Sequence, residues 1–370
     1  MEPSIESLVE RVQAARAART PLCIRAGGTK DFYGGPLRGD ALDPRGHEGI
    51  VDYEPSELVV TVRSGTPLAA LQSALDARGQ MLAFEPPHFG AGATVGGCVA
   101  SGLAGPRRAT AGALRDFVLG AHLLDGRGQV LKFGGTVMKN VAGYDVARLL
   151  AGSLGTLGVI LQVSLKVLPK PAVEATLQLE ADEAGALERM NAWGGQPLAI
   201  SATCWQCGTK PGLLSVRLSG SQASVDSARR QIGGSELAAP LAERLWSGLR
   251  EQTDPYFTDA PASPAPSTPG PLWRLSVPST APPLALAGAQ LIEWGGALRW
   301  LRTAEPAVAL RTRAQALGGH ATRFRAGEGR DDVFTPLAAP LAAIHQRLKR
   351  QFDPDRVFNR GRLFPEPDAH

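Results

Sequence analysis

Glycine and other very small residues crowd one stretch of the chain, from Phe84 to Ile160. Its first half contains GAGATVGGCVASG, which runs from Gly90 to Gly102. Glycine adopts positive φ without steric cost, and it lets backbone N–H groups face a bound molecule with no Cβ in between. Successive N–H groups held in this way bind phosphate oxygens. The stretch therefore predicts a phosphate-holding loop around which the rest of the chain has to fold.

Two common phosphate-binding motifs do not fit this stretch. The Rossmann fingerprint needs a strand directly before the glycines, a helix after them and an acid about twenty residues further on. Pro86 and Pro87 stand where that strand would be, and proline does not occupy central strands. Gly102, Gly105 and Pro106 interrupt the segment that would be the helix. The P-loop sequence GxxxxGK[ST] does not occur anywhere in the chain.

A second glycine turn lies far upstream, in the sequence RAGGTK at 25–30. We expect one ligand to be wrapped by two separate turns, 26–29 and 92–97. The hydroxyl groups of Thr29 and Thr94 are then available to phosphate oxygens. The alternative is that both turns are only structural.

Composition favours an α+β fold. The chain has 370 residues with 43 glycines and 29 prolines, which indicates many short strands and tight turns. A chain of this length exceeds the usual size of one core, so we expect more than one domain. The residue patterns predict an amphipathic helix around 5–12, strands over 22–25, 59–62 and 157–168, a helix that begins at Pro67 and ends at Gly79, a hairpin through Asp125 and Gly126, and a helix over 140–150.

Two prolines near residue 170 precede a change in character, because the glycine turns give way to repeated strand and helix units. We predict a first domain over 1–170 and a second over 171–340, with an antiparallel sheet covered by helices on one face. The second domain includes a proline-rich loop over 255–283, which contains nine prolines. A helix and tail over 341–370 return to the first domain.

The charge pattern argues against nucleic acid as a partner. The net charge is +4 and the pI is about 9.0, but the 39 Lys and Arg residues are scattered among 35 Asp and Glu residues. A nucleic-acid surface would need clustered basic residues. The N-terminus resembles no signal peptide, and no apolar run predicts a membrane span. We expect a cytoplasmic protein, which partner subunits can hold at the inner face of a membrane.

The four cysteines are Cys23, Cys98, Cys204 and Cys207, and the last two form one CxxC on a predicted strand. A zinc site or an iron–sulfur cluster needs further Cys or His ligands at suitable spacing, and none follow. We interpret the pair as structural, so an iron–sulfur cluster would belong to another chain.

The sequences RAGGTK, GATVGGCVASG and GYDVARLLAGSLGTLGVI together resemble the FAD-binding domain, of the PCMH type, in the vanillyl-alcohol oxidase and D-2-hydroxy-acid dehydrogenase superfamily. The tail FDPDRVFNRGR resembles the C-terminal flavin-side motif of that superfamily. Over the whole chain, with KNVAGYD and a shortened cap domain, the sequence is similar to the E-subunit family of bacterial glycolate oxidase. The tail departs from the pattern at Arg360, where related enzymes carry Pro.

The resemblance implies an FAD cradle with a two-subdomain fold. The implied cofactor-binding residues are Arg25, Ala26, Gly27, Gly28, Thr29, Lys30, Pro87, Gly92, Ala93, Thr94, Val95, Gly96, Gly97, Ala100, Ser101, Gly102, Gly158, Val159, Ile160 and Asn359. Some members tether the flavin through a His in the first loop, but RAGGTKDFYGG has none. We therefore predict non-covalent FAD, and the alternative of a thioether at Cys98 has less support because that position favours a small buried residue.

The catalytic residues stay open. Related dehydrogenases supply a metal through two histidines in the cap domain, whereas the corresponding segment here has only His320, so we predict no metal. Arg323 and Arg325 alternate on one predicted strand, so they would point to one face and could bind a carboxylate, as could Arg107 and Arg108. Lys139 and Tyr144 in KNVAGYD are candidates by resemblance only.

Three functions fit these residues. The first is an FAD subunit of a multi-subunit glycolate (2-hydroxy-acid) dehydrogenase, with a larger FAD subunit and an iron–sulfur subunit as partners. The second is a self-sufficient FAD-dependent D-2-hydroxy-acid dehydrogenase that acts on glycolate or D-lactate. The third is a non-catalytic subunit that holds flavin for assembly. The short cap and the missing histidine favour the first or the third.

Overall fold

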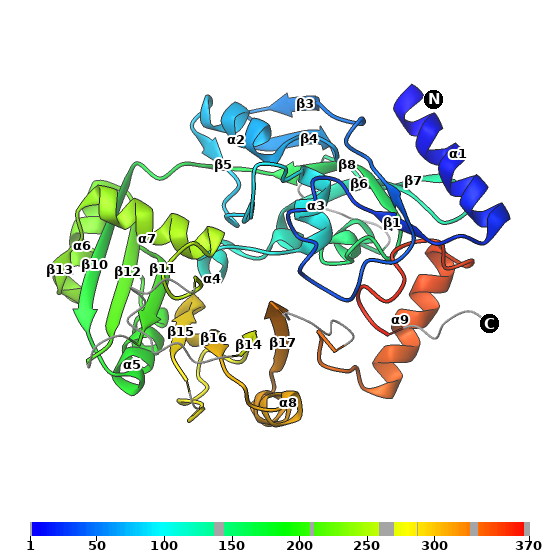
Figure 1. Cartoon of the computed structure of the whole chain (residues 1–370). Coiled ribbons are helices and arrows are strands. Elements are labelled where there is room, and N and C mark those ends of the chain that lie inside the picture. Colours follow the sequence, from blue (N-terminus) through cyan, green and yellow to red (C-terminus); the bar gives the residue numbers. More distant parts are fainter. Residues whose placement is uncertain are drawn as a thin grey trace.

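The computed structural model describes residues 2–136, 144–207, 211–258, 270–286, 288–325 and 332–365 (Figure 1). Helices and strands alternate along the chain and form two larger antiparallel sheets, so the predicted α+β class is confirmed. In the described part of the chain, no helix has the length and apolar character needed to cross a membrane.

The first sheet has five strands in the order β3, β4, β8, β6, β7. Its strands are β3 (Ile50–Glu54), β4 (Val59–Arg63), β6 (Val118–Leu124), β7 (Val130–Gly134) and β8 (Val159–Lys166). Helices α2 (Leu68–Asp76) and α3 (Val95–Ser101) bury their apolar residues in one core with β4, β6 and β8. The predicted hairpin is confirmed, because β6 and β7 pair across a turn that Asp125 closes by accepting the N–H groups of Arg127 and Gln129.

Shorter elements surround this sheet. They are α1 (Pro3–Ala18), β1 (Leu22–Ile24), β2 (Asp40–Leu42), β5 (Gln80–Met81), α4 (Arg108–Ala111), η1 (Leu114–Phe117), η2 (Ala147–Leu150) and β9 (Leu168–Pro169). Strand β1 pairs in parallel with β2. Its other edge receives the C-terminal tail, because Leu22 N–H donates to Val357 O and Asn359 N–H donates to Leu22 O. A segment near the C-terminus therefore lies beside β1, which follows the first helix (Figure 1).

The predicted helix over 140–150 is shorter in the structure. Residues 144–146 are not helical, and a single 3-10 turn, η2, follows. Ala147 and Leu150 are buried in this turn, whereas Tyr144 and Leu149 are exposed. Residues 140–143 of the predicted helix lie outside the described residues.

The second sheet has eight strands in the order β13, β10, β12, β11, β15, β16, β14, β17. Its strands are β10 (Val173–Glu180), β11 (Ile200–Gln206), β12 (Leu213–Gly220), β13 (Ser235–Glu236), β14 (Leu272–Ser276), β15 (Gln290–Glu293), β16 (Leu298–Arg302) and β17 (His320–Arg325). Strand β14 falls inside the range 255–283 that we predicted as a proline-rich loop, so that loop is shorter than predicted. Residues 259–269 lie outside the described part.

Helices cover both faces of this sheet, not the one face that we predicted. The helices are α5 (Glu183–Gly194), α6 (Gln222–Ile232), α7 (Ala239–Glu251) and α8 (Ala307–Ala316), with a short η3 (Trp294–Gly296). Leu177 of β10 packs with α5 and α6, whereas the neighbouring Thr176 accepts a hydrogen bond from Trp246 Nε1 of α7 at 2.9 Å. Adjacent strand residues point to opposite faces, so α7 lies on the face turned toward the first sheet.

Helix α9 (Ala339–Phe352) follows β17 and leads into the tail. It lies beside the first half of the chain, far from the β10 end of the second sheet (Figure 1). Asp353 fixes the turn after the helix, because its carboxylate accepts the N–H groups of Val357 and Phe358 at 2.8 Å and the Lys349 ammonium at 2.7 Å. This turn directs residues 357–359 toward β1.

Candidate functional site

The two predicted glycine turns touch each other in the structure. A Cβ added to Gly27 would overlap the carbonyl oxygen of Gly92, and one added to Gly92 would lie 3.1 Å from Gly27 O. Gly28 adopts φ +69°, which a residue with a side chain rarely takes. These glycines are therefore required by the close approach of two backbones.

A cavity of about 520 Å³, including its open mouth, lies against the joined turns. Its lining residues are Ala26, Gly27, Gly28, Thr29, Lys30, Asp31, Gly92, Thr94, Gly97, Ala100, Ser101, Leu154, Asn359 and Arg362. We call this space the cradle. Eleven of these fourteen residues are among the cofactor-binding residues predicted from sequence, and Asp31, Leu154 and Arg362 are the ones that the sequence did not indicate.

Nine predicted residues lie outside the lining of the cradle. Ala93, Val95, Val159 and Ile160 are buried in the hydrophobic core, and Pro87 is also buried, beside Phe89. The remaining four, which pack against neighbouring chain or lie at the surface, are Arg25, Gly96, Gly102 and Gly158.

Three of these glycines permit backbone contacts. Gly96 packs against Ser64, where a Cβ would come within 2.7 Å of the Ser64 Cβ. Gly102 similarly adjoins Gly152, and Gly158 adjoins Leu124. These three glycines shape the walls behind the cradle. The contacts explain why each residue is glycine, without any contact between its Cα atom and a ligand.

Lys30 places a partly buried cation at the cradle. Its ammonium donates to His88 O at 3.1 Å and lies 5.7 Å from the ring centre of Phe89. Burial lowers the pKa of Lys30, and the nearby Cys98 and Glu251 partly oppose that effect. A partly buried ammonium with few protein partners favours an anionic neighbour.

Thr94 caps α3 and has one hydrogen left to donate. Its hydroxyl oxygen accepts the Gly97 N–H at 3.2 Å. A threonine hydroxyl also carries a donor, so the side chain can satisfy the helix and still contact an oxygen of a ligand.

Two residues of the C-terminal tail, Asn359 and Arg362, line the cradle. Asn359 Oδ1 accepts the Ile24 N–H at 2.7 Å, and its Nδ2 donates to Leu154 O at 2.6 Å. The Arg362 guanidinium donates to the carbonyl groups of Gly35, Tyr33 and Asp31. Both side chains thus hold the first glycine turn in place, a role that the motif NRGR did not indicate by itself.

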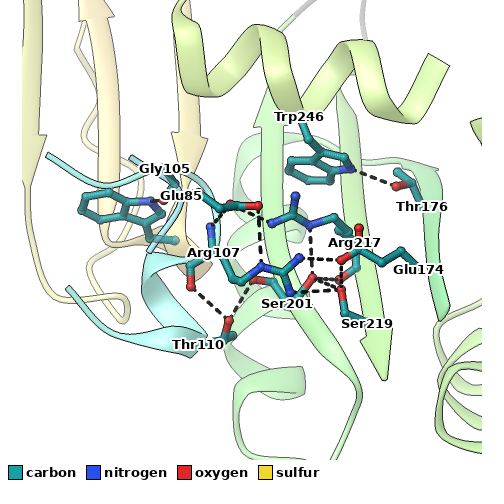
Figure 2. Close-up of polar contacts among 11 residues, drawn as sticks. Glu85, Gly105, Arg107, Thr110, Glu174, Thr176, Ser201, Arg217, Ser219 and Trp246 are labelled. Atoms are coloured by element: carbon teal, nitrogen blue, oxygen red, sulfur yellow. Dashed lines mark hydrogen bonds and ion pairs between the residues drawn. The ribbon is translucent and has the colours of Figure 1, made fainter. Parts of the chain in front are cut away.

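A buried polar network binds the glycine stretch, at Glu85 and Arg107, to the second sheet (Figure 2). Glu85 accepts the Arg107 N–H at 2.8 Å and the Arg217 Nη2 at 2.9 Å. Arg107 Nη2 donates to Glu174 at 2.5 Å, and Arg217 stacks 4.9 Å from the ring centre of Trp246. Burial raises the pKa of Glu85, but Arg217 and Arg107 lower it by more, so the net shift is downward.

Glu251, at the end of α7, binds the start of the glycine stretch. Its carboxylate accepts the N–H groups of His88 and Phe89 at 2.9 and 3.0 Å and contacts His88 Nδ1 at 3.0 Å. Burial raises its pKa, yet the bonds from His88, Phe89 and Arg250 lower the pKa of Glu251 to about 2. Helix α7, which packs against the second sheet, therefore holds the start of the glycine stretch in place.

The predicted pair Arg323 and Arg325 does not share a face. A β-bulge in β17 shifts the register, so Arg325 pairs with Leu272 whereas Arg323 pairs with Trp273. Leu272 and Trp273 point to opposite faces of β14. Arg325 lies 4.1 Å from the ring centre of Phe32 and donates to Gln252 Oε1 at 3.0 Å.

The other catalytic candidates are dispersed. His320 is exposed at the start of β17, and loss of hydration followed by the charges of Arg274 and Arg108 lowers its pKa. Tyr144 has 97% of its surface exposed. Lys139 lies outside the described residues.

Comparisons with known proteins agree with this geometry. A family model described as an FAD binding domain matches residues 3–134. The chain is 48% identical to the glycolate oxidase subunit GlcE of Escherichia coli over 98% of this chain and 97% of that protein. It is 32% identical to the glycolate oxidase subunit GlcD of Bacillus subtilis, over 43% of this chain and 34% of that protein.

Two further similarities concern parts of the chain or its fold. A D-lactate dehydrogenase of Anaerostipes hadrus is 39% identical over 33% of this chain and 25% of that protein. A solved structure of an alkyldihydroxyacetonephosphate synthase has a TM-score of 0.65 at 14% identity, covering 95% of this chain and 74% of that one. At that identity the likeness supports the fold alone.

The fold and the cradle define an FAD-dependent oxidoreductase of the PCMH type. The chain belongs to the family of the glycolate oxidase subunit GlcE. FAD is its cofactor. The cradle fits that group, because small residues bring two backbones to its edge and the partly buried ammonium of Lys30 suits a diphosphate. FAD supplies hydride and electron transfer.

Proposed function

We propose that this chain is the FAD-containing subunit of a multi-subunit glycolate dehydrogenase and passes reducing equivalents to an iron–sulfur partner. The observation that supports this most is the similarity to GlcE over nearly the full length of both chains. The names of GlcE and GlcD both contain the word subunit, which supports an assembly in which a larger FAD protein is a second partner.

A second candidate is a self-sufficient D-2-hydroxy-acid dehydrogenase. The partial similarity to a D-lactate dehydrogenase favours it. In that case the isolated chain itself would take a hydride from glycolate or D-lactate and pass the electrons to a quinone or a dye.

Anaerobic mixing separates the two candidates. The FAD-loaded chain is mixed with glycolate or D-lactate while the flavin absorbance is followed, alone and after addition of its co-purified partners. We expect bleaching only with the partners. Bleaching in the isolated chain would replace the first proposal with the second, and a purification that recovers neither another flavoprotein nor a cluster protein would contradict the complex.

A further inference from the structure

A second cavity adjoins the cradle at the C-terminal end of α3. Ser101 and Leu154 line both spaces. The remaining lining residues of this cavity include Tyr33, Arg108 and Phe334. A molecule in this second cavity would therefore lie next to a molecule in the cradle.

Two guanidinium groups contact one indole ring near this cavity. Arg108 lines the cavity itself, whereas Arg274 lines a smaller pocket and hydrogen-bonds Tyr33 in the cavity wall. The Arg108 guanidinium carbon lies 4.7 Å from the ring centre of Trp294, and that of Arg274 lies 5.2 Å from the same ring. Trp294 is buried, and its Nε1 donates to Gly105 O at 3.1 Å. The indole is thus fixed by the chain that follows the glycine stretch, and it holds both cations in place.

The like charges act on one another across this cluster. Burial and then the charge of Arg274 lower the pKa of Arg108 to about 10. Burial and then the same two charges lower the pKa of His320. Bringing cationic groups together costs free energy unless an anion lies among them.

Two acidic groups and one hydroxyl group lie near the cluster. The Tyr33 hydroxyl hydrogen-bonds Arg274. Asp116 caps η1 through the Ala113 N–H. Glu293 accepts the Trp300 Nε1–H at 2.8 Å. Burial raises the pKa of Glu293 to about 7, although this bond and the charge of Arg274 oppose the shift.

No salt bridge joins a carboxylate to Arg108 or Arg274 among the residues that the structure describes. This distinguishes the cluster from Arg107 and Arg217. Arg107 and Arg217 pair with Glu85.

We propose that Arg108 and Arg274 form a binding site for a small carboxylate anion, beside the FAD cradle. The inference rests on the proposed function, in which that anion is the carboxylate of a 2-hydroxy acid. A planar carboxylate matches guanidinium donors in a bidentate way, and it offsets the repulsion between the two cations. The site is built by two separate parts of the chain, α4 and β14, so it forms only when the second sheet packs against the glycine stretch.

Oxalate, a carboxylate that offers no hydride, tests binding apart from turnover. The FAD-loaded chain, with its partners where they co-purify, is titrated with labelled oxalate by equilibrium dialysis. We expect Arg108→Gln and Arg274→Gln each to raise the Kd for oxalate about tenfold or more, with unchanged FAD content. Arg108→Lys keeps the charge and should restore part of the affinity, which a loss of folding would not.

Arg115→Gln is the matched control. Arg115 lines the same cavity, but its side chain is 68% exposed and lies 3.9 Å from Asp116, so oxalate binding should not change. Equal affinity of wild type, Arg108→Gln and Arg274→Gln for oxalate would overturn the site. Inorganic phosphate that competes as strongly as oxalate would overturn the assignment to a carboxylate.

The outcome also separates this inference from the proposed function. If oxalate binding depends on Arg108 and Arg274 but the assembled complex never oxidises glycolate, the site stands and the proposed function fails. If glycolate is oxidised while both variants bind oxalate as the wild type does, the function stands and this site is wrong.

Discussion

At the scale of single residues, Gly27 carries the most specific constraint, because its Cα faces the Gly92 carbonyl with no room for a methyl group. Gly27→Ala should force the two turns apart and remove most of the bound FAD, although the chain still folds. Gly46→Ala is the control, since a Cβ there meets nothing within 4 Å. Flavin absorbance per mole of purified protein is the measurement. Full FAD content in Gly27→Ala would contradict the cradle.

Cys98 is the residue at which covalent attachment can be tested. Its thiol is buried in the core of the first sheet, and burial raises the pKa of Cys98 to about 12. The thiolate needed as a nucleophile is therefore scarce. We expect acid precipitation to release all of the FAD into the supernatant and Cys98→Ser to retain FAD. Flavin that stays with the precipitate of the wild type but not of Cys98→Ser would establish a thioether.

At the scale of elements, the bond from α7 to the glycine stretch makes stability depend on pH. The pKa of Glu251 is about 2 in the folded chain and about 4.5 ordinarily. A carboxyl group whose pKa is lower in the folded state stabilises the fold at pH values above its unfolded pKa. This contribution is lost as the pH falls toward 2. The difference corresponds to about 3 kcal/mol.

Denaturant unfolding between pH 6 and pH 3 measures this contribution. We expect the wild type to lose stability below about pH 4.5 and Glu251→Gln to lose stability at neutral pH but to show a flatter pH profile. Glu188→Gln, an exposed position on α5, should behave as the wild type. Parallel profiles for Glu251→Gln and wild type would contradict the role of this carboxylate.

Some features of the cradle and its surroundings could be predicted from the sequence, and others could not. Glycine turns are readable because only glycine permits the contact of Gly27 with Gly92, so position and residue type coincide. Arg362 was missed because its three carbonyl partners are more than 300 residues away in sequence. The bulge in β17 was missed because the alternation of side chains between the two faces of a strand assumes regular pairing. One extra residue between Arg323 and Arg325 breaks that alternation. Arg108 and Arg274 meet only through tertiary packing.

At the scale of the whole molecule, the cradle and the carboxylate site both depend on how the second sheet docks beside the glycine stretch. The network of Glu85, Arg107, Arg217 and Glu174 crosses that contact (Figure 2). Trp246 and Leu249 of α7 share a hydrophobic core with Tyr33, Leu103 and Leu154 of the first half. Apolar burial therefore provides attraction, and the ion pairs select the one arrangement in which each buried charge has a partner.

Removal of one member of this network should cost more than removal of a pair. Arg217→Ala leaves Glu85 buried with fewer donors and should lower the free energy of unfolding by about 3 kcal/mol, with loss of FAD because the glycine stretch is released. The double variant Glu85→Gln with Arg217→Met keeps the volume and has no unpaired charge, so it should lose less than Arg217→Ala alone. Chemical denaturation of the three proteins tests this. If the double variant loses as much stability as Arg217→Ala or more, Glu85 and Arg217 are not coupled, and the contact is held by α7 packing instead.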